Sequence, residues 1–325
     1  MTVQIPSVQT AALIKNPGPN ARIEIRHDYP VPQPGKNEVL LKMECSGICY
    51  SDIYIYTGNN PHYDEVPCHE GIGQVVQVGP DAADTLLGQR VGLGWIYSYV
   101  VANADYLMPI PDELPSSHAA PFLCGGITMV GALSLSDDAL ADGDTLVISG
   151  SGGGLGHLGL QLASNMKSHK RLNIIAIDTG STKQKLSLEL GADTFIDFET
   201  ENVIKRVMQL TNGKGADVAI VVPAATEAFD QALKYLKFTG TMVCAGITRM
   251  DYRLPISPTE LEYRGLVIKA CNVGSEKQLK DLLISASKKE VVPKVEVFEF
   301  SKTGELFERV KRGDIVGRFV VQIPQ

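Results

Sequence analysis

A metal ion could be held by three residues of this sequence, Cys49, His69 and Cys124. Two thiolates and one imidazole leave the fourth position of a tetrahedral zinc open, which is the arrangement of a catalytic rather than a structural site. Glu70 follows His69 directly and brings a carboxylate to the same place. Their spacing alone is weak support, because the sequence has no C-x-x-C pair and free cysteine is commonly a small core residue.

A second candidate site is a glycine-rich segment that joins the apolar run Leu146-Val147-Ile148-Ser149 to a helical pattern. It reads Gly150-Ser151-Gly152-Gly153-Gly154-Leu155-Gly156, one residue longer inside the loop than the standard G-x-G-x-x-G. A dinucleotide site needs this order, because the turn must be tight and the helix N-terminus must face the pyrophosphate. Glycine-rich turns also occur for packing alone, so the loop needs further support.

Asp178 provides that support, because it ends the next expected strand, where an acid accepts hydrogen bonds from the adenosine ribose. The alternative interpretation is an N-cap for the helix that follows Ser181. An acid at this position disfavours a 2′-phosphate, so we predict NAD in preference to NADP.

The elements that must position these residues fall into two patterns. The first third of the chain is rich in short strands punctuated by proline and glycine, which is typical of an irregular antiparallel fold. From residue 144, apolar strands alternate with helical patterns near 156–168, 181–190, 201–210, 225–237 and 275–288. The expected strands are Thr145–Ser149, Asn173–Asp178, Thr194–Phe198, Asp217–Val222, Thr241–Ala245 and Leu266–Cys271. This alternation predicts an α/β fold with a doubly wound parallel sheet. Capping boxes are expected at Ser181 and Ser275.

The composition excludes several classes of protein. Its 325 residues allow about two domains. A net charge of −7 gives no electrostatic footprint for nucleic acid or an anionic membrane. No apolar run is long enough to span a membrane, and the N-terminus does not have the pattern of a secretory signal. Six cysteines are too few for a disulfide scaffold, so we expect a cytoplasmic protein with reduced thiols.

The local sequences around the candidate ligands resemble the zinc-ligand motifs of the zinc-containing alcohol dehydrogenases, in the medium-chain dehydrogenase/reductase superfamily. The motifs are Gly47-Ile48-Cys49-Tyr50-Ser51-Asp52, Pro67-Cys68-His69-Glu70-Gly71 and Phe122-Leu123-Cys124-Gly125-Gly126. Their order matches the family, and the yeast-type branch is the most similar. The resemblance covers nearly the whole chain. It implies a mostly antiparallel catalytic domain of the GroES-like type at 1–118 and 288–325, and a Rossmann domain at 119–287.

The resemblance also implies roles for individual residues. Cys49, His69 and Cys124 would bind one catalytic zinc, and Glu70 would be an outer group or an alternating fourth ligand. Asp52 would orient the histidine, and Ser51 would lie between the substrate oxygen and a proton relay. The remaining positions that match family contacts are Trp95 in the alcohol pocket, Lys183 at the adenosine ribose and Arg318 at the cofactor pyrophosphate.

The sequence departs from the family pattern at four places. The four-cysteine structural zinc lobe that should follow Trp95 is absent, so no structural zinc is expected. Tyr54 replaces the relay histidine, and its ordinary pKa of about 10 makes it a poorer base; relay and packing roles stay open. Glu276 stands where an arginine often lies near the cofactor phosphates. Cys68 replaces the usual glycine before His-Glu, where packing is the favoured interpretation.

The sequence therefore predicts an NAD-dependent zinc alcohol dehydrogenase or carbonyl reductase whose substrate is a small-molecule alcohol, aldehyde or ketone. Two alternatives stay open, namely a zinc-independent reductase of activated C=C bonds and a protein of the same fold that has lost dehydrogenase activity. The resemblance also implies a homo-oligomer, a dimer or tetramer, that pairs near Leu266–Cys271. No nucleic acid or membrane partner is expected.

Overall fold

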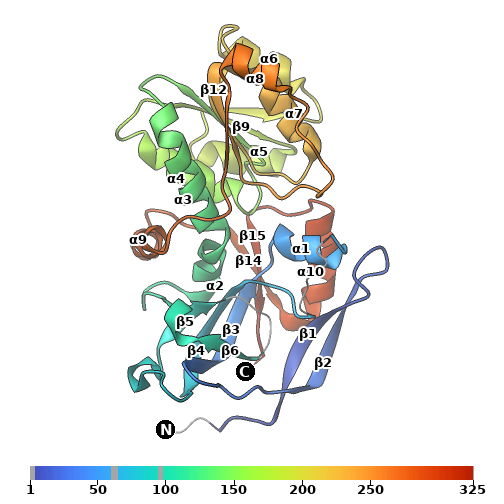
Figure 1. The fold of residues 1–325 in the computed structure, drawn as a ribbon, viewed down its shortest axis with the longest axis vertical. Coiled ribbons are helices and arrows are strands. Elements are labelled where there is room, and N and C mark those ends of the chain that lie inside the picture. The colour runs from blue at the N-terminus through green and yellow to red at the C-terminus, as the bar shows by residue number, and fades with distance from the viewer. Residues whose placement is uncertain (1–3, 60–64, 94–97, 325) are drawn as a thin grey trace. The chain divides into compact units, whose positions relative to one another are not determined.

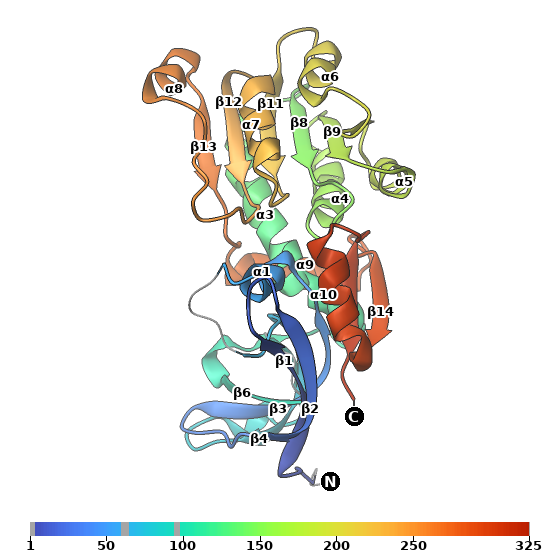
Figure 2. The same cartoon turned by 90° about the vertical axis from the view of Figure 1, so that its right-hand side faces the viewer.

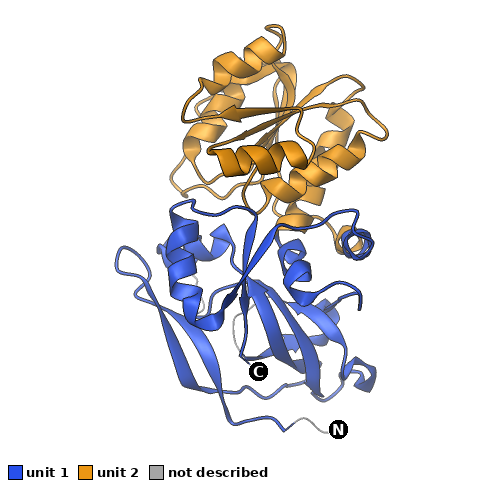
Figure 3. Ribbon diagram, turned by 180° about the vertical axis from the view of Figure 1, so that it is seen from behind, with its two compact units in different colours: residues 1–124, 280–325 blue, residues 125–279 orange. Residues whose placement is uncertain are grey.

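A computed structural model describes residues 4–59, 65–93 and 98–324 of the chain. The chain forms two compact units, one of residues Met1–Cys124 and Lys280–Gln325, the other of Gly125–Leu279 (Figure 3). The first unit therefore extends past the expected boundary at 118, to Cys124, and resumes at Lys280 rather than at 288. Among the described residues, no single helix has both the length and the apolar character needed to cross a membrane.

The second unit is built on a six-stranded parallel sheet with the order β10-β9-β8-β11-β12-β13 (Figure 1). All five residues of β8 are buried, as expected for a central strand covered by helices on both faces. The strands are β8 (Thr145–Ser149), β9 (Asn173–Asp178), β10 (Thr194–Asp197), β11 (Ala216–Val221), β12 (Leu236–Cys244) and β13 (Val267–Ala270).

Helices α4 (Gly156–Met166), α5 (Ser181–Glu189), α6 (Val203–Leu210) and α7 (Thr226–Tyr235) connect successive strands where the alternating pattern predicts them, and α8 (Pro258–Arg264), which the pattern does not predict, connects β12 to β13. Helix α3 (Gly125–Ser136) precedes β8, and α9 (Glu276–Ser287) follows β13 and continues past the end of the unit at Leu279. The capping box at Ser275 is confirmed, because Ser275 and Gln278 exchange side chain-to-backbone hydrogen bonds. The one at Ser181 is wrong. The N-cap of α5 is Gly180 at φ 87°, which has no capping side chain.

The first unit contains a seven-stranded mixed sheet with the order β14-β15-β3-β4-β5-β7, in which β6 also pairs with β3. A separate antiparallel pair is formed by β1 and β2 (Figure 2). The strands are β1 (Val8–Lys15), β2 (Arg22–Pro30), β3 (Glu38–Gly47), β4 (Glu70–Val78), β5 (Arg90–Leu93), β6 (Tyr99–Asn103), β7 (Met108–Pro109), β14 (Val295–Glu299) and β15 (Arg318–Gln322).

Among its described residues the first unit also contains helices α1 (Tyr50–Tyr56), α2 (Ser116–Ala119) and α10 (Thr303–Lys311), together with the C-terminal part of α9. Helix α1 packs on α10 through the rings of Tyr56 and Phe307, whose centroids are 5.4 Å apart. Strands β3 and β4 pair antiparallel, so that the end of β3 at Gly47 lies opposite the start of β4 at Glu70. This pairing brings the motif around Cys49 beside the motif around His69.

Candidate metal centre and cofactor loop

The N-terminus of α1 anchors the candidate metal centre. Cys49 is the N-cap residue, and its backbone N–H donates to Oδ2 of Asp52 over 2.8 Å. The other oxygen of Asp52 accepts from the backbone N–H of Cys68, also over 2.8 Å. A buried carboxylate requires such donors, and Asp52 is only 1% exposed. Asp52 therefore ties the two ligand-bearing segments together.

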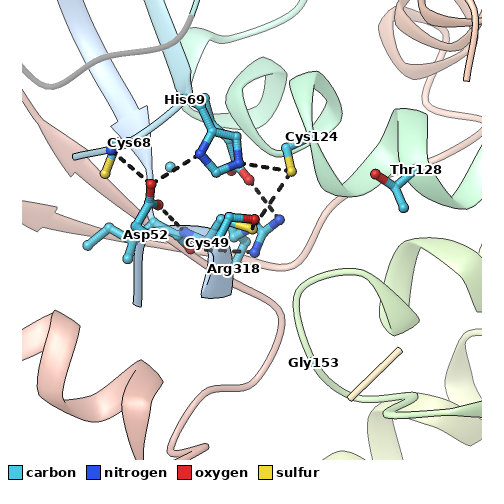
Figure 4. A network of polar contacts seen from close by, with 12 residues as sticks. Cys49, Asp52, Cys68, His69, Cys124, Thr128, Gly153 and Arg318 are labelled. Atoms are coloured by element: carbon cyan, nitrogen blue, oxygen red, sulfur yellow. Dashed lines mark hydrogen bonds and ion pairs between the residues drawn. The ribbon is translucent and has the colours of Figure 1, made fainter. Parts of the chain in front are cut away.

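The imidazole of His69 lies between Asp52 and Cys124 (Figure 4). Its Nδ1 is 3.1 Å from Oδ1 of Asp52, and its Nε2 is 3.0 Å from Sγ of Cys124. Sγ of Cys124 is in turn 3.7 Å from Sγ of Cys49. With a proton on Nδ1, the histidine presents the lone pair of Nε2 to the thiols, as a metal ligand must.

Glu70 completes a cluster in which one ligand atom from each of four residues lies within 4.8 Å of every other. Its carboxylate is fully buried and forms an ion pair with Nη2 of Arg318 over 2.7 Å. Burial raises the pKa of Glu70 to about 8, while the Arg318 guanidinium acts in the opposite direction. The donor set of two sulfurs, one imidazole nitrogen and one carboxylate fits zinc, which accepts all three atom types.

The contact between the two cysteine thiols shifts their pKa values in opposite directions. The hydrogen bond from Cys124 lowers the pKa of Cys49 well below its ordinary value. The same contact raises the pKa of Cys124 well above it. The contact thus favours the thiolate form at Cys49, and thiolate is the form of cysteine that binds metals.

Two further residues from the sequence prediction lie in the same unit. Ser51 places Oγ 3.6 Å from Sγ of Cys49, beside the metal centre. Tyr54 lies on α1, and its phenolic oxygen is buried with no hydrogen-bond partner in the described part of the chain. Trp95, the predicted pocket residue, lies outside the described residues.

The glycine-rich loop connects the end of β8 to the start of α4. Gly150 adopts φ 76°, a left-handed conformation that favours glycine. A Cβ at Gly156 would stand 2.0 Å from the carbonyl oxygen of Gly150, so the turn closes only without a side chain there. An added Cβ at Gly153 would make only an ordinary van der Waals contact, 3.6 Å from the same oxygen. Gly153 and Gly154 are only partly buried, so their backbone lies accessible next to the helix N-terminus, which fits a pyrophosphate.

Asp178 lies at the end of β9 and holds this loop. Its Oδ2 accepts from the backbone N–H of Gly152, and its Oδ1 accepts from Thr179 N and Lys183 Nζ, each over 2.9 Å. The carboxylate is 5% exposed and does not cap α5. The two residues predicted for the adenosine ribose, Asp178 and Lys183, thus form an ion pair beside the loop.

Comparison with known proteins agrees with this arrangement. Residues 35–112 match the alcohol dehydrogenase GroES-like domain, and residues 154–288 match the zinc-binding dehydrogenase family. An alcohol dehydrogenase of Geobacillus stearothermophilus is 33% identical over 90% of this chain and 94% of its own length. The protein belongs to the zinc-containing alcohol dehydrogenase family. It is therefore an enzyme, an oxidoreductase that interconverts alcohols and carbonyl compounds.

Other members of the family match over a similar length. Alcohol dehydrogenase 2 of Emericella nidulans is 32% identical and covers 98% of this chain and 99% of its own. Among solved structures, an acetophenone reductase from Geotrichum candidum in complex with NAD superposes with a TM-score of 0.85, at 22% identity and 98% coverage of both chains. The α/β fold with a Rossmann-type parallel sheet and a GroES-like unit is thereby confirmed.

Two features of this zinc alcohol dehydrogenase family member were missed by the sequence prediction. One is the backbone N–H of Cys68, which reaches Asp52 because Cys68 adopts a left-handed φ of 77°. The other is Gly47, which was recognised only as part of a motif. An added Cβ at Gly47 would lie 2.0 Å from Oε2 of Glu70. The sequence carried a signal for the first feature, because the family usually has glycine at the position of Cys68 and glycine readily adopts a left-handed φ.

Proposed function

We propose that this protein is an NAD-dependent zinc alcohol dehydrogenase or carbonyl reductase with one catalytic zinc. The observation that carries the proposal is the convergence of Cys49, His69 and Cys124, with their ligand atoms within 4.8 Å of one another. These three residues would bind the zinc, and the carboxylate of Glu70 would lie next to it as an outer group. Zinc bound there would act as a Lewis acid that polarises the alcohol or carbonyl oxygen of the substrate.

The residues around the ligands have supporting roles. Asp52 holds the Nδ1 proton of His69, which fixes the tautomer and raises the basicity of Nε2. The hydroxyl of Ser51 would exchange the proton that leaves or enters at the substrate oxygen. Tyr54 would pass that proton onward; its phenolic oxygen is buried without a partner among the described residues, which supports a relay role over packing alone.

The cofactor would bind at the loop that begins with Gly150, with its pyrophosphate against the N-terminus of α4. Asp178 would accept a hydrogen bond from the ribose, since Oδ2 receives only one donor within the unit. Its negative charge disfavours the 2′-phosphate of NADP, which supports the preference for NAD. Lys183 would contact the same ribose. Arg318 stays a predicted pyrophosphate contact; its guanidinium is 2% exposed and is paired with Glu70.

We further infer that there is no structural zinc. Strand β5 ends at Leu93 and β6 begins at Tyr99, so the connecting segment is too short for the four-cysteine lobe of the family. Trp95 in that segment would line the alcohol pocket. The yeast-type branch stays our assignment on the quoted motifs.

The protein is proposed to be a cytoplasmic homo-oligomer, a dimer or a tetramer. Strand β13 lies at the edge of its sheet, and Val267 on it is 42% exposed. An unprotected edge strand can pair with the same strand of a second copy. Sedimentation equilibrium would show a dimer or larger, and Val267→Lys would shift the distribution to monomers.

Metal analysis of protein purified without chelator tests the central proposal. We expect about one zinc per chain, as for a lone catalytic site, and loss of both zinc and alcohol oxidation in Cys49→Ser. Activity that survives chelation and the loss of Cys124 would instead indicate a zinc-independent reductase of C=C bonds. Absence of any NADH fluorescence change at millimolar cofactor would indicate a protein that has lost dehydrogenase activity.

A further inference from the structure

Gly47 and Glu70 lie directly opposite each other in the pairing of β3 with β4. The side chain of Glu70 folds back over the space that a side chain at Gly47 would fill. A Cβ built on Gly47 would stand 2.0 Å from Oε2, 3.0 Å from Cδ and 3.1 Å from Cβ of Glu70. Gly47 has no left-handed φ, so its backbone does not require glycine. Residue 47 is therefore glycine because the carboxylate of Glu70 occupies the space that a side chain there would need.

A displaced Glu70 would have few places to go. The carboxylate is fully buried and cannot swing out to solvent. One side is occupied by the guanidinium of Arg318, already 2.7 Å away. Another holds the ligand atoms of the metal centre, which lie within 4.8 Å of a Glu70 oxygen. A buried carboxylate needs a cation or hydrogen-bond donors around it, so with Arg318 on one side a displaced Glu70 moves toward the metal position.

We propose that Gly47 is a positioning residue that keeps Glu70 off the catalytic zinc and so leaves the fourth coordination position open to substrate. This inference rests on the proposed zinc centre. A side chain at residue 47 converts an open, catalytic site into a closed one with a carboxylate as fourth ligand. Closed four-coordinate sites are the arrangement of structural zinc.

Cobalt-substituted protein tests the proposal without relying on turnover, because the visible absorption of Co²⁺ reports its ligands. In the wild-type protein, added imidazole should occupy the open position and shift the absorption bands. In Gly47→Ala the bands should already differ without imidazole. If Glu70 occupies the position in more than nine-tenths of the molecules, the apparent imidazole affinity falls about tenfold or more.

Removal of the carboxylate provides the decisive comparison. The Glu70→Ala variant removes the ion-pair partner of Arg318, so the loss of stability of this single variant is measured separately. Gly47→Ala combined with Glu70→Ala should bind imidazole as tightly as Glu70→Ala alone. If Gly47→Ala does not fold, the same double variant should recover soluble protein. A double variant that binds imidazole as weakly as Gly47→Ala, or that also fails to fold, overturns the proposal.

Gly73→Ala is the matched control. Gly73 lies on β4, and a Cβ there would meet the carbonyl oxygen of Lys42 at 2.7 Å and Sδ of Met43 at 2.8 Å. It crowds the same two strands without touching Glu70. We expect lower stability but an unchanged imidazole response, and an equal loss of the response in both glycine variants would overturn the proposal. Failure of the wild-type protein to bind Co²⁺ or imidazole would instead contradict the proposed zinc centre.

Discussion

At the scale of single residues, Asp52 determines how the two ligand motifs meet. Its carboxylate receives three N–H groups, from the backbone of Cys49, the backbone of Cys68 and the ring of His69. The first two fix segments that are far apart in the sequence, and the third fixes the histidine ring. Because a carboxylate offers only acceptors, it suits a place where every neighbour is a donor.

Asp52→Asn should therefore weaken zinc binding more than it weakens folding. The amide NH₂ would face either the N–H of Cys49 or the two N–H groups of Cys68 and His69, so at least one hydrogen bond is lost. In the second orientation the His69 tautomer is no longer enforced, and in the first a neutral amide oxygen replaces the carboxylate as its acceptor. We expect zinc affinity to fall roughly 10- to 100-fold, the usual effect of removing a partner of a metal ligand. Competition with a chromophoric chelator measures it. Asp28→Asn, at an exposed position, should leave the affinity unchanged.

Cys45 makes the stability of the fold depend on alkaline pH. Burial, the largest cause, raises the pKa of its thiol from 9.0 to about 12. Between these values the unfolded chain loses the proton while the folded chain keeps it, so stability falls as pH rises above 9. The thiol contributes a slope of about 1.4 kcal/mol per pH unit.

Urea unfolding between about pH 8 and 10.5 measures this slope. Cys45→Ala should unfold more easily at pH 8, because a buried side chain is shortened, but its stability should fall less steeply with pH than that of the wild type. The other buried thiols titrate in both proteins and cancel in the comparison. Equal slopes in the two proteins would contradict the assignment to Cys45.

At the scale of elements, strand β12 differs most from its predicted form. The sequence predicts a strand over Thr241–Ala245, but β12 begins at Leu236. Within the added part, Thr239 adopts φ 61°, a left-handed conformation that is unusual for a β-branched residue. Helix α8 was also missed, because its seven residues follow a proline-rich stretch with no apolar periodicity.

Replacement of Thr239 by asparagine should stabilise the protein by about 1 kcal/mol, because asparagine tolerates the left-handed region that disfavours a β-branched side chain. Thr239 is exposed, so no core contact is lost. The midpoint of urea unfolding should rise without a change in its slope. Thr200→Asn is the control, since Thr200 is also exposed but has an ordinary φ, and it should give no gain.

At the scale of the whole molecule, the two candidate sites belong to different units. All four members of the metal cluster lie in the unit of residues 1–124 and 280–325, whereas the cofactor loop and Asp178 lie in the other. Each ligand stabilises the unit that binds it. Zinc and the cofactor can therefore be removed independently of each other.

Chelation should accordingly loosen only the first unit. Hydrogen exchange should increase over 49–56 and 68–72 when zinc is removed, and stay unchanged over 150–178. Addition of NADH should protect 150–178 in the chelated and the zinc-loaded protein alike. Uniform changes across both units after chelation would contradict this division.

The sequence by itself predicted which residues form the candidate metal cluster and their order along the chain, the glycine loop after β8 and the alternation that builds the parallel sheet. These features can be predicted from neighbouring residues, because strand periodicity, tight turns and motifs each depend on only a few consecutive positions of the chain. It also predicted correctly that Ser275 caps a helix, but not that the N-cap of α5 is Gly180 rather than Ser181.

Only the tertiary structure decided how the separate motifs meet. Cys68 reaches Asp52, and Gly47 makes room for Glu70, because the register of β3 with β4 brings them together. The ion pair of Arg318 with Glu70 likewise joins β15 to the start of β4. Register and burial depend on the whole core at once, so no local pattern contains them. Gly47, on the opposite strand, has no side chain, and the carboxylate of Glu70 lies in the space that this leaves.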